Sequence, residues 1–454
     1  MMNSQAPTPG LDALLQNARR RSGLTQEQLA GLSTVSVRAI RDLEQGRVQH
    51  PRKETLRLLA GAMRLSDARR IELELAVDAH SVGRVFQDSY GAELAAPPTP
   101  LRPLVGRVAE LEALTFRLST EHERLLTLVG LPGVGKSRLA QEATLRIHAR
   151  DQVPVLWVPM DRPDENADTA DRSPQSTMVG WVRSLVRDGE KYDELAAVIG
   201  SKPTLIVLDG HDASPVVSPP VLNLLRSCER LKILITSRRP VQPPGGRLLP
   251  LAPLPVPVPA GTLPGDSLVT DRPAVELMLS YVSHMRPDVL PTDALTTTLA
   301  DICHALDGIP QALEAAASWL LLYSPEQLLD VARTTPLVLV DGVTPADPAS
   351  GATLGDQLSA VVTGLNPHAT ALLDTLAALP EPWTVDDAAH AAGTALAETA
   401  RDVHALLLRG LIRQHPSAPG GPVGFTVLNL VRELLEAGRG GADEINEAVE
   451  AMAF

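Results

Sequence analysis

The sequence RLLTLVGLPGVGKSRLA, residues 124–140, places an apolar run directly before a glycine-rich turn and a more polar segment. Within it, Gly130-x-x-x-x-Gly135-Lys136-Ser137 has the residue types and spacing of a phosphate-binding loop. Glycines allow backbone N–H groups to converge on an anion, and the dipole of the following helix adds to their attraction. The stretch predicts a strand at 125–129, a helix over 137–148 and a nucleotide phosphate site between them.

The polar groups of this loop define the expected nucleotide and metal contacts. The Lys136 ammonium suits the β- and γ-phosphates, and the Ser137 hydroxyl is a ligand for Mg²⁺. A second apolar run, 204–208, ends in Asp209, the pattern of a metal-binding strand in such proteins. We therefore expect ATP or ADP and Mg²⁺ as cofactors, with Ser137 and Asp209 on the metal. The expected nucleotide contacts in the loop are Gly130, Gly133, Val134, Gly135, Lys136, Ser137 and Arg138.

Further apolar runs extend this pattern into an α/β domain. Short runs at 155–158 and 232–236 alternate with helical stretches, which is typical of a parallel sheet covered on both faces. The run at 232–236 leads into Arg238, whose guanidinium suits a sensor of the γ-phosphate. The alternative for Arg238 is an exposed loop residue.

Length and composition restrict the class of protein. A chain of 454 residues exceeds one ordinary core, so three or four domains are expected. Cys228 and Cys303 are too few for a disulfide framework, which indicates a reducing compartment. We expect a cytoplasmic protein without a membrane span, because 1–10 lacks the pattern of a secretory signal and the oily tract at 248–264 is broken by prolines.

The net charge of −13 is unevenly distributed along the chain. Residues 1–80 carry 12 Lys and Arg against 9 Asp and Glu, so the excess of acid lies in the remainder. A basic segment on an acidic protein indicates one module that binds a polyanion.

This basic segment has the pattern of a small helical bundle. Thr25 is expected to cap a helix over 26–31, and after a turn at 32–35 Ser36 is expected to cap a second helix, which Gly46 terminates. Two short helices joined by a four-residue turn form a helix-turn-helix, and a further helix is expected to start at Pro51. The expected core residues are Leu29, Ala30, Val35, Ile40, Leu43, Leu56, Leu58, Leu59 and Met63.

The sequence GLTQEQLA…VSVRAIRDLEQGR resembles the XRE (lambda-repressor-like) family over residues 11–66. The resemblance implies binding to an operator in double-stranded DNA, with base edges read by the second helix and phosphates held by nearby arginines. One departure is Thr34, where many members have glycine. The alternative is a protein-docking bundle. The residues that the resemblance assigns to DNA are Gln26, Ser36, Val37, Arg38, Arg41, Asp42, Arg47, Arg52 and Lys53.

Residues 101–440 resemble the NB-ARC type of STAND signalling ATPases. LVGR at 104–107 resembles the segment that opens this module and borders the adenine. LDGIPQAL at 306–313 resembles its GLPL motif, whose proline approaches the nucleotide, and 372–434 resembles its winged helix. The resemblance adds Val105, Gly106, Arg107, Arg238 and Pro310 to the expected nucleotide contacts.

Two departures from that family bear on its chemistry. Gly210 stands where many relatives carry a second acid, so Asp212 is the expected substitute, beside Asp209, for polarising water. Leu428 and Asn429 stand at the histidine and aspartate positions of the MHD motif. They imply a nucleotide lock that is weaker or built differently.

These segments together predict a multidomain chain. It comprises a helix-turn-helix bundle at 1–80, a linker at 81–100, a P-loop α/β domain with a parallel sheet at 101–262, a helical subdomain at 263–345 and a winged-helix domain with its tail at 346–454.

The resemblances imply a bacterial transcriptional regulator that ATP and ADP switch, with slow hydrolysis and nucleotide-dependent homo-oligomers. No 34-residue repeat follows the winged helix, so the sensor is absent, is the winged helix itself or lies on a separate protein. Alternatives are an immune-type signalling ATPase, such as a phage-defence sensor, and a DNA-binding protein with permanently bound ADP.

Overall fold

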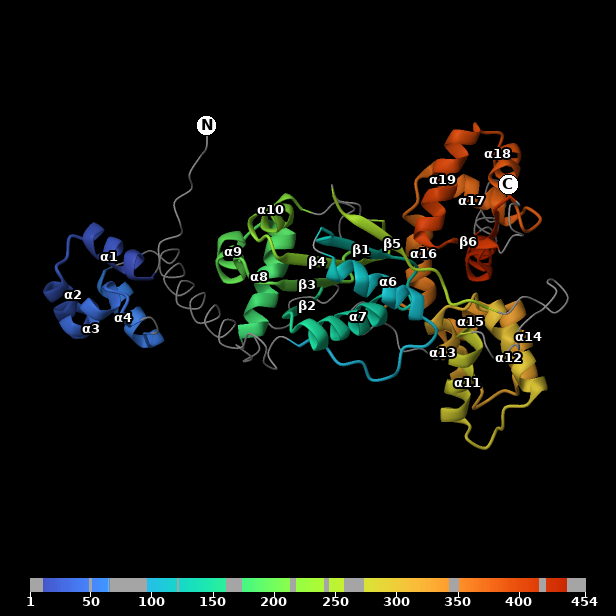
Figure 1. The fold of residues 1–454 in the computed structure, drawn as a ribbon, viewed down its shortest axis with the longest axis horizontal. Coiled ribbons are helices and arrows are strands. Elements are labelled where there is room, and N and C mark those ends of the chain that lie inside the picture. Colours follow the sequence, from blue (N-terminus) through green and yellow to red (C-terminus); the bar gives the residue numbers. More distant parts are fainter. Residues whose placement is uncertain are drawn as a thin grey trace, which may run out of the picture.

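The computed structural model shows a helical bundle, an α/β domain and two further, mainly helical units in chain order (Figure 1). It describes residues 11–48, 51–63, 65, 96–120, 122–160, 174–212, 218–240, 245–256, 273–342, 351–415 and 422–438. Of the expected linker at 81–100, only 96–100 falls within the described residues, where the chain is neither helix nor strand.

In the described part of the N-terminal bundle, four helices pack together, namely α1 (Leu11–Arg21), α2 (Gln26–Ser33), α3 (Val37–Glu44) and α4 (Lys53–Ala62). Both predicted caps are confirmed. The Thr25 hydroxyl accepts a hydrogen bond from the Gln28 N–H, and the Ser36 hydroxyl accepts one from the Ala39 N–H. The predicted core is confirmed for the buried residues Leu29, Ile40, Leu43, Leu56, Leu59 and Met63, with Ala30 and Val35 partly buried against them.

Three details of the predicted bundle are wrong. Helix α2 continues to Ser33 instead of ending at Gly31, so the turn is shorter than four residues. Helix α4 begins at Lys53 rather than at Pro51. Leu58, expected in the core, is 40% exposed, because the apolar stripe of an α-helix recurs every three or four residues and excludes a position beside Leu59.

The α/β domain is built on a five-stranded parallel sheet in the order β2-β3-β4-β1-β5. Its strands are β1 (Leu125–Val129), β2 (Val155–Pro159), β3 (Thr204–Asp209), β4 (Leu231–Ser237) and β5 (Arg247–Pro250). The first four confirm the predicted strands. Strand β5 was not predicted, because this short edge strand is only half-buried and lacks a continuous apolar run.

Helices cover both faces of this sheet (Figure 1). One face packs against α6 (Val108–Ser119) and α7 (Lys136–Asp151). The other packs against α8 (Pro174–Asp188), α9 (Tyr192–Ile199) and α10 (Pro219–Ser227). Because β1 leads directly into α7, the phosphate loop lies at the carboxyl end of a central strand, where open parallel sheets form their ligand crevice.

The helical subdomain comprises α11 (Pro273–Met285), α12 (Asp293–Ala305), α13 (Pro310–Trp319), α14 (Pro325–Thr334) and α15 (Pro336–Asp341). The remaining elements are α16 (Leu354–Thr363), α17 (Pro367–Ala377), α18 (Val385–Ala392), α19 (Leu396–Arg409), the antiparallel strands β6 (Ile412–His415) and β7 (Gly424–Val427), and a helix over 429–438.

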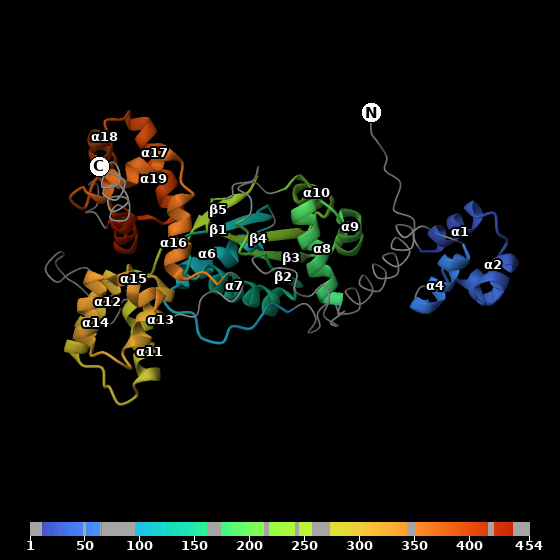
Figure 2. The ribbon, with the colours of Figure 1, turned by 180° about the vertical axis from the view of Figure 1, so that it is seen from behind.

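Both views place the helical subdomain and the α17–α19 unit at the same end of the sheet, with α16 between them (Figures 1 and 2). Three helices followed by a two-stranded hairpin agree with the winged helix expected from the resemblance. One continuous core joins residues of α7, the helical subdomain and this winged helix. Among the described residues, no helix is both long and apolar enough to cross a membrane.

Candidate functional site

The phosphate loop has a backbone that only glycine adopts easily at two positions. Gly133 has a φ of +73° and Gly135 a φ of +99°, both in the left-handed region. Helix α7 begins directly afterwards, and no side chain caps its N-terminus. A Cβ on Gly130 would overlap the carbonyl oxygen of Leu251. The loop therefore presents the start of α7, with its backbone N–H groups, to a ligand.

Lys136 lies along this loop. Its Nζ donates to the carbonyl oxygens of Gly130 at 2.9 Å and Leu131 at 2.7 Å, so the ammonium is held by the two residues that precede the turn. Burial lowers the pKa of Lys136 to about 8, although the nearby carboxylates of Asp212 and Asp209 oppose this shift. A phosphate in the loop would supply the anionic partner that carbonyl oxygens replace only in part.

The two residues predicted to hold Mg²⁺ are in direct contact. The Ser137 hydroxyl donates to Asp209 Oδ1 at 2.6 Å, and the Thr236 hydroxyl donates to the same oxygen at 2.6 Å. No group of three or more His, Cys, Asp and Glu side chains suited to a metal occurs in the described part of the chain. A hydroxyl and one carboxylate suit Mg²⁺, which commonly completes its shell with water and nucleotide phosphates.

Asp212 and Arg238 are paired with each other. Arg238 donates to Asp212 from Nε at 2.5 Å and from its backbone N–H at 2.6 Å, and the Ser237 hydroxyl donates to the same carboxylate. Burial would raise the pKa of Asp212, but the charge and hydrogen bonds of Arg238 hold it below its usual range. The Arg238 Nη1 also donates to Gln357 on α16 at 3.2 Å. Arg238 thus links the sheet edge to α16, and the exposed-loop alternative does not describe its contacts.

Arg107 connects the phosphate loop to two other segments of the chain. Its guanidinium is only 5% exposed and donates to the carbonyl oxygens of Val134 and Ala252 and to Glu110. Burial lowers the pKa of Arg107. At Gly106, with a φ of +65°, a Cβ would overlap Pro273 at the start of α11. The segment 104–107 thus holds the phosphate loop against the helical subdomain.

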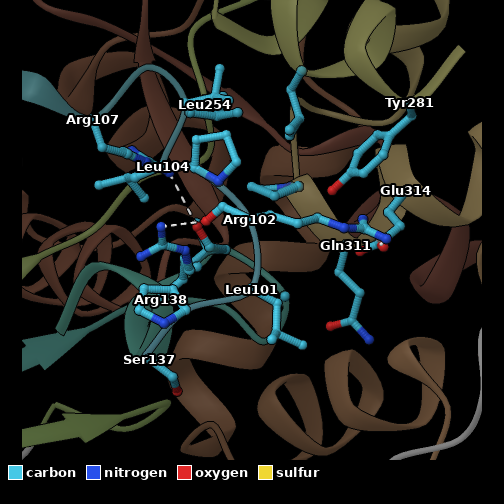
Figure 3. A pocket seen from close by; sticks show the side chains of 18 of the residues that line it. Leu101, Arg102, Leu104, Arg107, Ser137, Arg138, Leu254, Tyr281, Gln311 and Glu314 are labelled. Carbon is cyan, nitrogen blue, oxygen red and sulfur yellow. Dashed lines mark hydrogen bonds and ion pairs between the residues drawn. The ribbon is translucent and has the colours of Figure 1, made fainter. Parts of the chain in front are cut away.

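A cavity of about 1040 Å³ opens beside the loop, between the α/β domain and the helical subdomain. Figure 3 shows its lining side chains, with Ser137 and Arg138 on one side and Tyr281, Gln311 and Glu314 on the other. Its apolar lining consists mainly of Leu101, Leu104, Val105, Leu254, Leu277, Met285 and Pro310. An apolar wall beside a phosphate loop suits a nucleotide base. Of the residues predicted from sequence, Gly106, Gly130, Asp209, Asp212 and Arg238 do not line this cavity.

Several residues that close the cavity were not predicted. Arg102 pairs with Glu314 at 2.7 Å and lies 5.4 Å from the ring centre of Tyr281, and Arg138 donates to the Arg102 carbonyl oxygen at 2.6 Å (Figure 3). The Gln311 N–H donates to the Gly133 carbonyl oxygen at 3.2 Å. No sequence pattern links Arg102 to Glu314, because they are 212 residues apart.

The predicted DNA contacts divide into exposed and engaged groups. The side chains of Arg38, which is 93% exposed, Arg41 and Arg47 are exposed, and Asp42 lies 3.9 Å from Arg38 and 3.5 Å from Arg47. Ser36 uses its hydroxyl to cap α3.

Gln26, which the resemblance assigns to DNA, donates to Glu44 at 2.8 Å, and Arg19 completes this cluster at 2.6 Å. Val37 is half-buried and Arg52 is exposed, while the side chain of Lys53 lies outside the described residues.

Comparison with known proteins supports the N-terminal assignment. Residues 11–73 match a family described as a helix-turn-helix domain, so the chain carries such a domain followed by a parallel-sheet α/β domain. A Mycobacterium tuberculosis protein named uncharacterized protein Rv0894 is 32% identical over 232 residues, which are 50% of this chain and 53% of that protein. The chain thus matches about half the length of this relative.

A second M. tuberculosis protein, Rv0890c, is 31% identical over 217 residues, which are 47% of this chain and 22% of that protein. Its name assigns it provisionally to the HTH-type transcriptional regulators.

Two solved structures are also similar. AMPPCP-bound DnaA from Aquifex aeolicus is 12% identical, with 68% of this chain and 89% of that chain covered and a TM-score of 0.33. Cdc6p from Pyrobaculum aerophilum is 12% identical, with 77% and 98% covered and a TM-score of 0.27. Both TM-scores are below 0.5, so neither structure is used to assign the fold. The parallel sheet and the geometry of the phosphate loop assign it.

Proposed function

We propose that this protein is a DNA-binding transcriptional regulator of the STAND type, switched by ATP and ADP. The observation that carries the proposal is that the phosphate loop touches both C-terminal units. The Gln311 N–H of the helical subdomain donates to the Gly133 carbonyl oxygen. Gly410 of the winged helix packs on Leu131, since a Cβ at Gly410 would lie only 3.1 Å from Leu131 Cγ. A ligand that alters the loop therefore acts directly on the positions of both units.

The nucleotide site is assigned to the loop and the cavity beside it. Lys136 and the start of α7 would hold the phosphates, Ser137 and Asp209 would hold Mg²⁺, and Val105 and Pro310 would border the base. ATP carries a γ-phosphate that ADP lacks. Arg238 is the side chain proposed to sense this difference.

Slow hydrolysis is part of the proposal. The second acid is missing at Gly210, and Asp212 is engaged by Arg238 and Ser237. A general base must reach the proton that it abstracts, so Asp212 would act on water only after this pairing loosens. We propose Asp209 and Asp212 as the catalytic carboxylates of such a slow reaction, which suits a switch.

The DNA site is assigned to α3 and its surroundings. Arg38 and Arg41 project from the second helix of the helix-turn-helix, where side chains read base edges in the major groove. One bundle carries one such helix, so nucleotide-dependent assembly would raise operator affinity by placing several bundles on one DNA. The inducing signal is proposed to come from a small molecule or a separate protein.

The DNA half is tested with the full chain and a duplex operator selected from a random pool. We expect Arg38→Ala and Arg41→Ala each to weaken binding about 5- to 150-fold, because a base contact contributes roughly 1–3 kcal/mol. Arg333→Ala, an exposed arginine of the helical subdomain, is the matched control and leaves binding unchanged. If all three variants bind the operator as tightly as the wild-type protein does, the regulator proposal is wrong and the protein-docking alternative is favoured.

The switch is tested by light scattering and DNA binding in ATP, in ADP and without nucleotide. We expect the wild-type protein to differ in subunit number and operator affinity between the nucleotides, and Lys136→Ala to abolish both differences. A wild-type protein that behaves identically in all three conditions contradicts the switch, and ADP that survives dialysis would favour a structural nucleotide.

A further inference from the structure

Asp307 is a fully buried carboxylate that the proposed nucleotide chemistry does not use. It follows α12 in the helical subdomain, with a φ of +58° and 0% exposure. Both of its oxygens contact the winged helix. Arg413 Nη2 donates to Oδ1 at 2.5 Å, and the Leu430 N–H donates to Oδ2 at 2.9 Å. A charged group buried at this depth requires such partners, and here both come from more than 100 residues away.

The contact with Leu430 supplies a helix cap from another unit. The helix over 429–438 begins after Leu428, whose side chain cannot accept a hydrogen bond from the exposed N–H groups of the first turn. Asp307 takes the role that a capping side chain normally plays within its own helix. Asn429 reinforces the junction, since its Nδ2 donates to the His304 carbonyl oxygen at 2.9 Å.

A short segment of the winged helix connects this junction to the phosphate loop. Gly410, which packs on Leu131 of the loop, is three residues from Arg413. The Leu428 N–H donates to the carbonyl oxygen of Leu411, which is also buried in the shared core. The contacts of Asp307 therefore fix the part of the winged helix that rests on the loop.

We propose that Asp307, through Arg413 and the Leu430 N–H, is the latch that holds the winged helix closed on the helical subdomain. The inference rests on the proposed nucleotide switch and names the contact that the switch breaks. The family that this region resembles has a histidine at the position of Leu428, and in this chain the latch would take over its role.

The physics of the pair suits a reversible contact. When the two units separate, the carboxylate, the guanidinium and the first turn of the helix 429–438 all become hydrated, which offsets the loss of their mutual contacts. An apolar junction of the same size lacks this compensation. Because ligand linkage is reciprocal, a nucleotide that prefers the open form weakens the latch, and a weakened latch raises the affinity for that nucleotide.

Two variants test the latch in the full chain, with hydrogen exchange of the Leu430 amide as the first readout. We expect Asp307→Asn to speed that exchange about tenfold or more, because a hydrogen bond to a charged group is lost. Arg413→Gln should have a larger effect, since it leaves the buried carboxylate without its cation. Arg432→Gln is the matched control, because Arg432 pairs with Glu381 inside the winged helix, and it should leave the Leu430 amide protected.

The second readout is the ratio of ATP to ADP affinity. We expect both latch variants to change this ratio by about 5- to 150-fold and the control to leave it unchanged. Faster exchange with an unchanged ratio would reduce Asp307 to a static cap and overturn the latch, as would unchanged exchange in both folded variants. If Asp307→Asn fails to fold, Arg413→Gln carries the test.

Failure of the proposed function is distinguished by the wild-type protein. If wild type and Lys136→Ala both bind no nucleotide, the proposed switch fails. The radius of gyration of the nucleotide-free Asp307→Asn protein then still decides the latch, with an increase over wild type expected and an unchanged value contradicting it.

Discussion

Lys136 combines two requirements that oppose each other. It must lie within the phosphate loop to reach a phosphate, and this burial lowers its pKa to about 8. Between pH 8 and the ordinary value of 10.5, the unfolded chain binds the proton and the folded protein does not. The contribution of Lys136 to the free energy of unfolding therefore increases as the pH rises through this window.

Nucleotide binding is expected to be linked to proton uptake at alkaline pH. Phosphate favours the charged ammonium, so Lys136 should contribute an uptake of nearly one proton per nucleotide at pH 9 and none at pH 6.5. Calorimetry in buffers of different ionisation enthalpy measures this number. Lys191→Met, which removes a lysine paired with Glu194 away from the loop, should leave it unchanged. Equal proton uptake at both pH values would contradict the role of Lys136.

At the scale of the element, the turn of the helix-turn-helix contains a strained residue. Thr34 ends α2 with a φ of +60°, a conformation that costs a β-branched residue roughly 1–3 kcal/mol. Its hydroxyl donates to the Ser33 carbonyl oxygen at 2.6 Å, which offsets part of this cost. Many proteins of the family that this bundle resembles have glycine at this position, and the positive φ of Thr34 gives the physical reason.

Thr34→Gly is expected to stabilise the bundle by about 1 kcal/mol, because glycine removes the strain but has more backbone entropy to lose. Native-state hydrogen exchange of α2 and α3 in the full chain reports this locally. Thr25→Ala, which removes the cap of α2, should act in the opposite direction by about 1 kcal/mol. Faster exchange in Thr34→Gly would show that the hydroxyl contact outweighs the strain.

At the scale of the whole molecule, the winged helix is held on the phosphate loop by close packing at one glycine. Gly410 ends α19 with a φ of +78°, and a Cβ there would lie 3.1 Å from Leu131 Cγ. Gly393 ends α18 with a similar φ of +63°, but a Cβ there would meet nothing within 4 Å. The two positions share the backbone requirement and differ only in the contact between units.

Gly410→Val is therefore expected to disturb nucleotide binding where Gly393→Val does not. Both substitutions should lower the melting temperature, since valine is strained at a positive φ. Only Gly410→Val displaces Leu131 and should change the nucleotide Kd, by about tenfold for each 1.4 kcal/mol of lost docking. Titration of both variants with ADP and ATP makes the comparison, and identical Kd values would show that the winged helix does not act through this contact.

Local patterns accounted for a large part of the architecture. Four strands of the sheet, the two caps of the helix-turn-helix and the glycine conformations of the phosphate loop follow from residues that are neighbours in the chain. Strand β5 was missed, because this short, half-buried edge strand lacks a continuous apolar run. Leu58 was placed in the core although the spacing of the apolar stripe through Leu59 excludes it.

The sequence by itself determined the classes of the two N-terminal domains and the residues of the phosphate loop. Propensity, capping and glycine chemistry act over a few residues and remain readable without a fold. Only the tertiary structure decided which side chains meet across the chain, such as Arg102 with Glu314, Arg238 with Asp212, and Asp307 with Arg413. These contacts depend on how the units pack, and no local pattern encodes that packing.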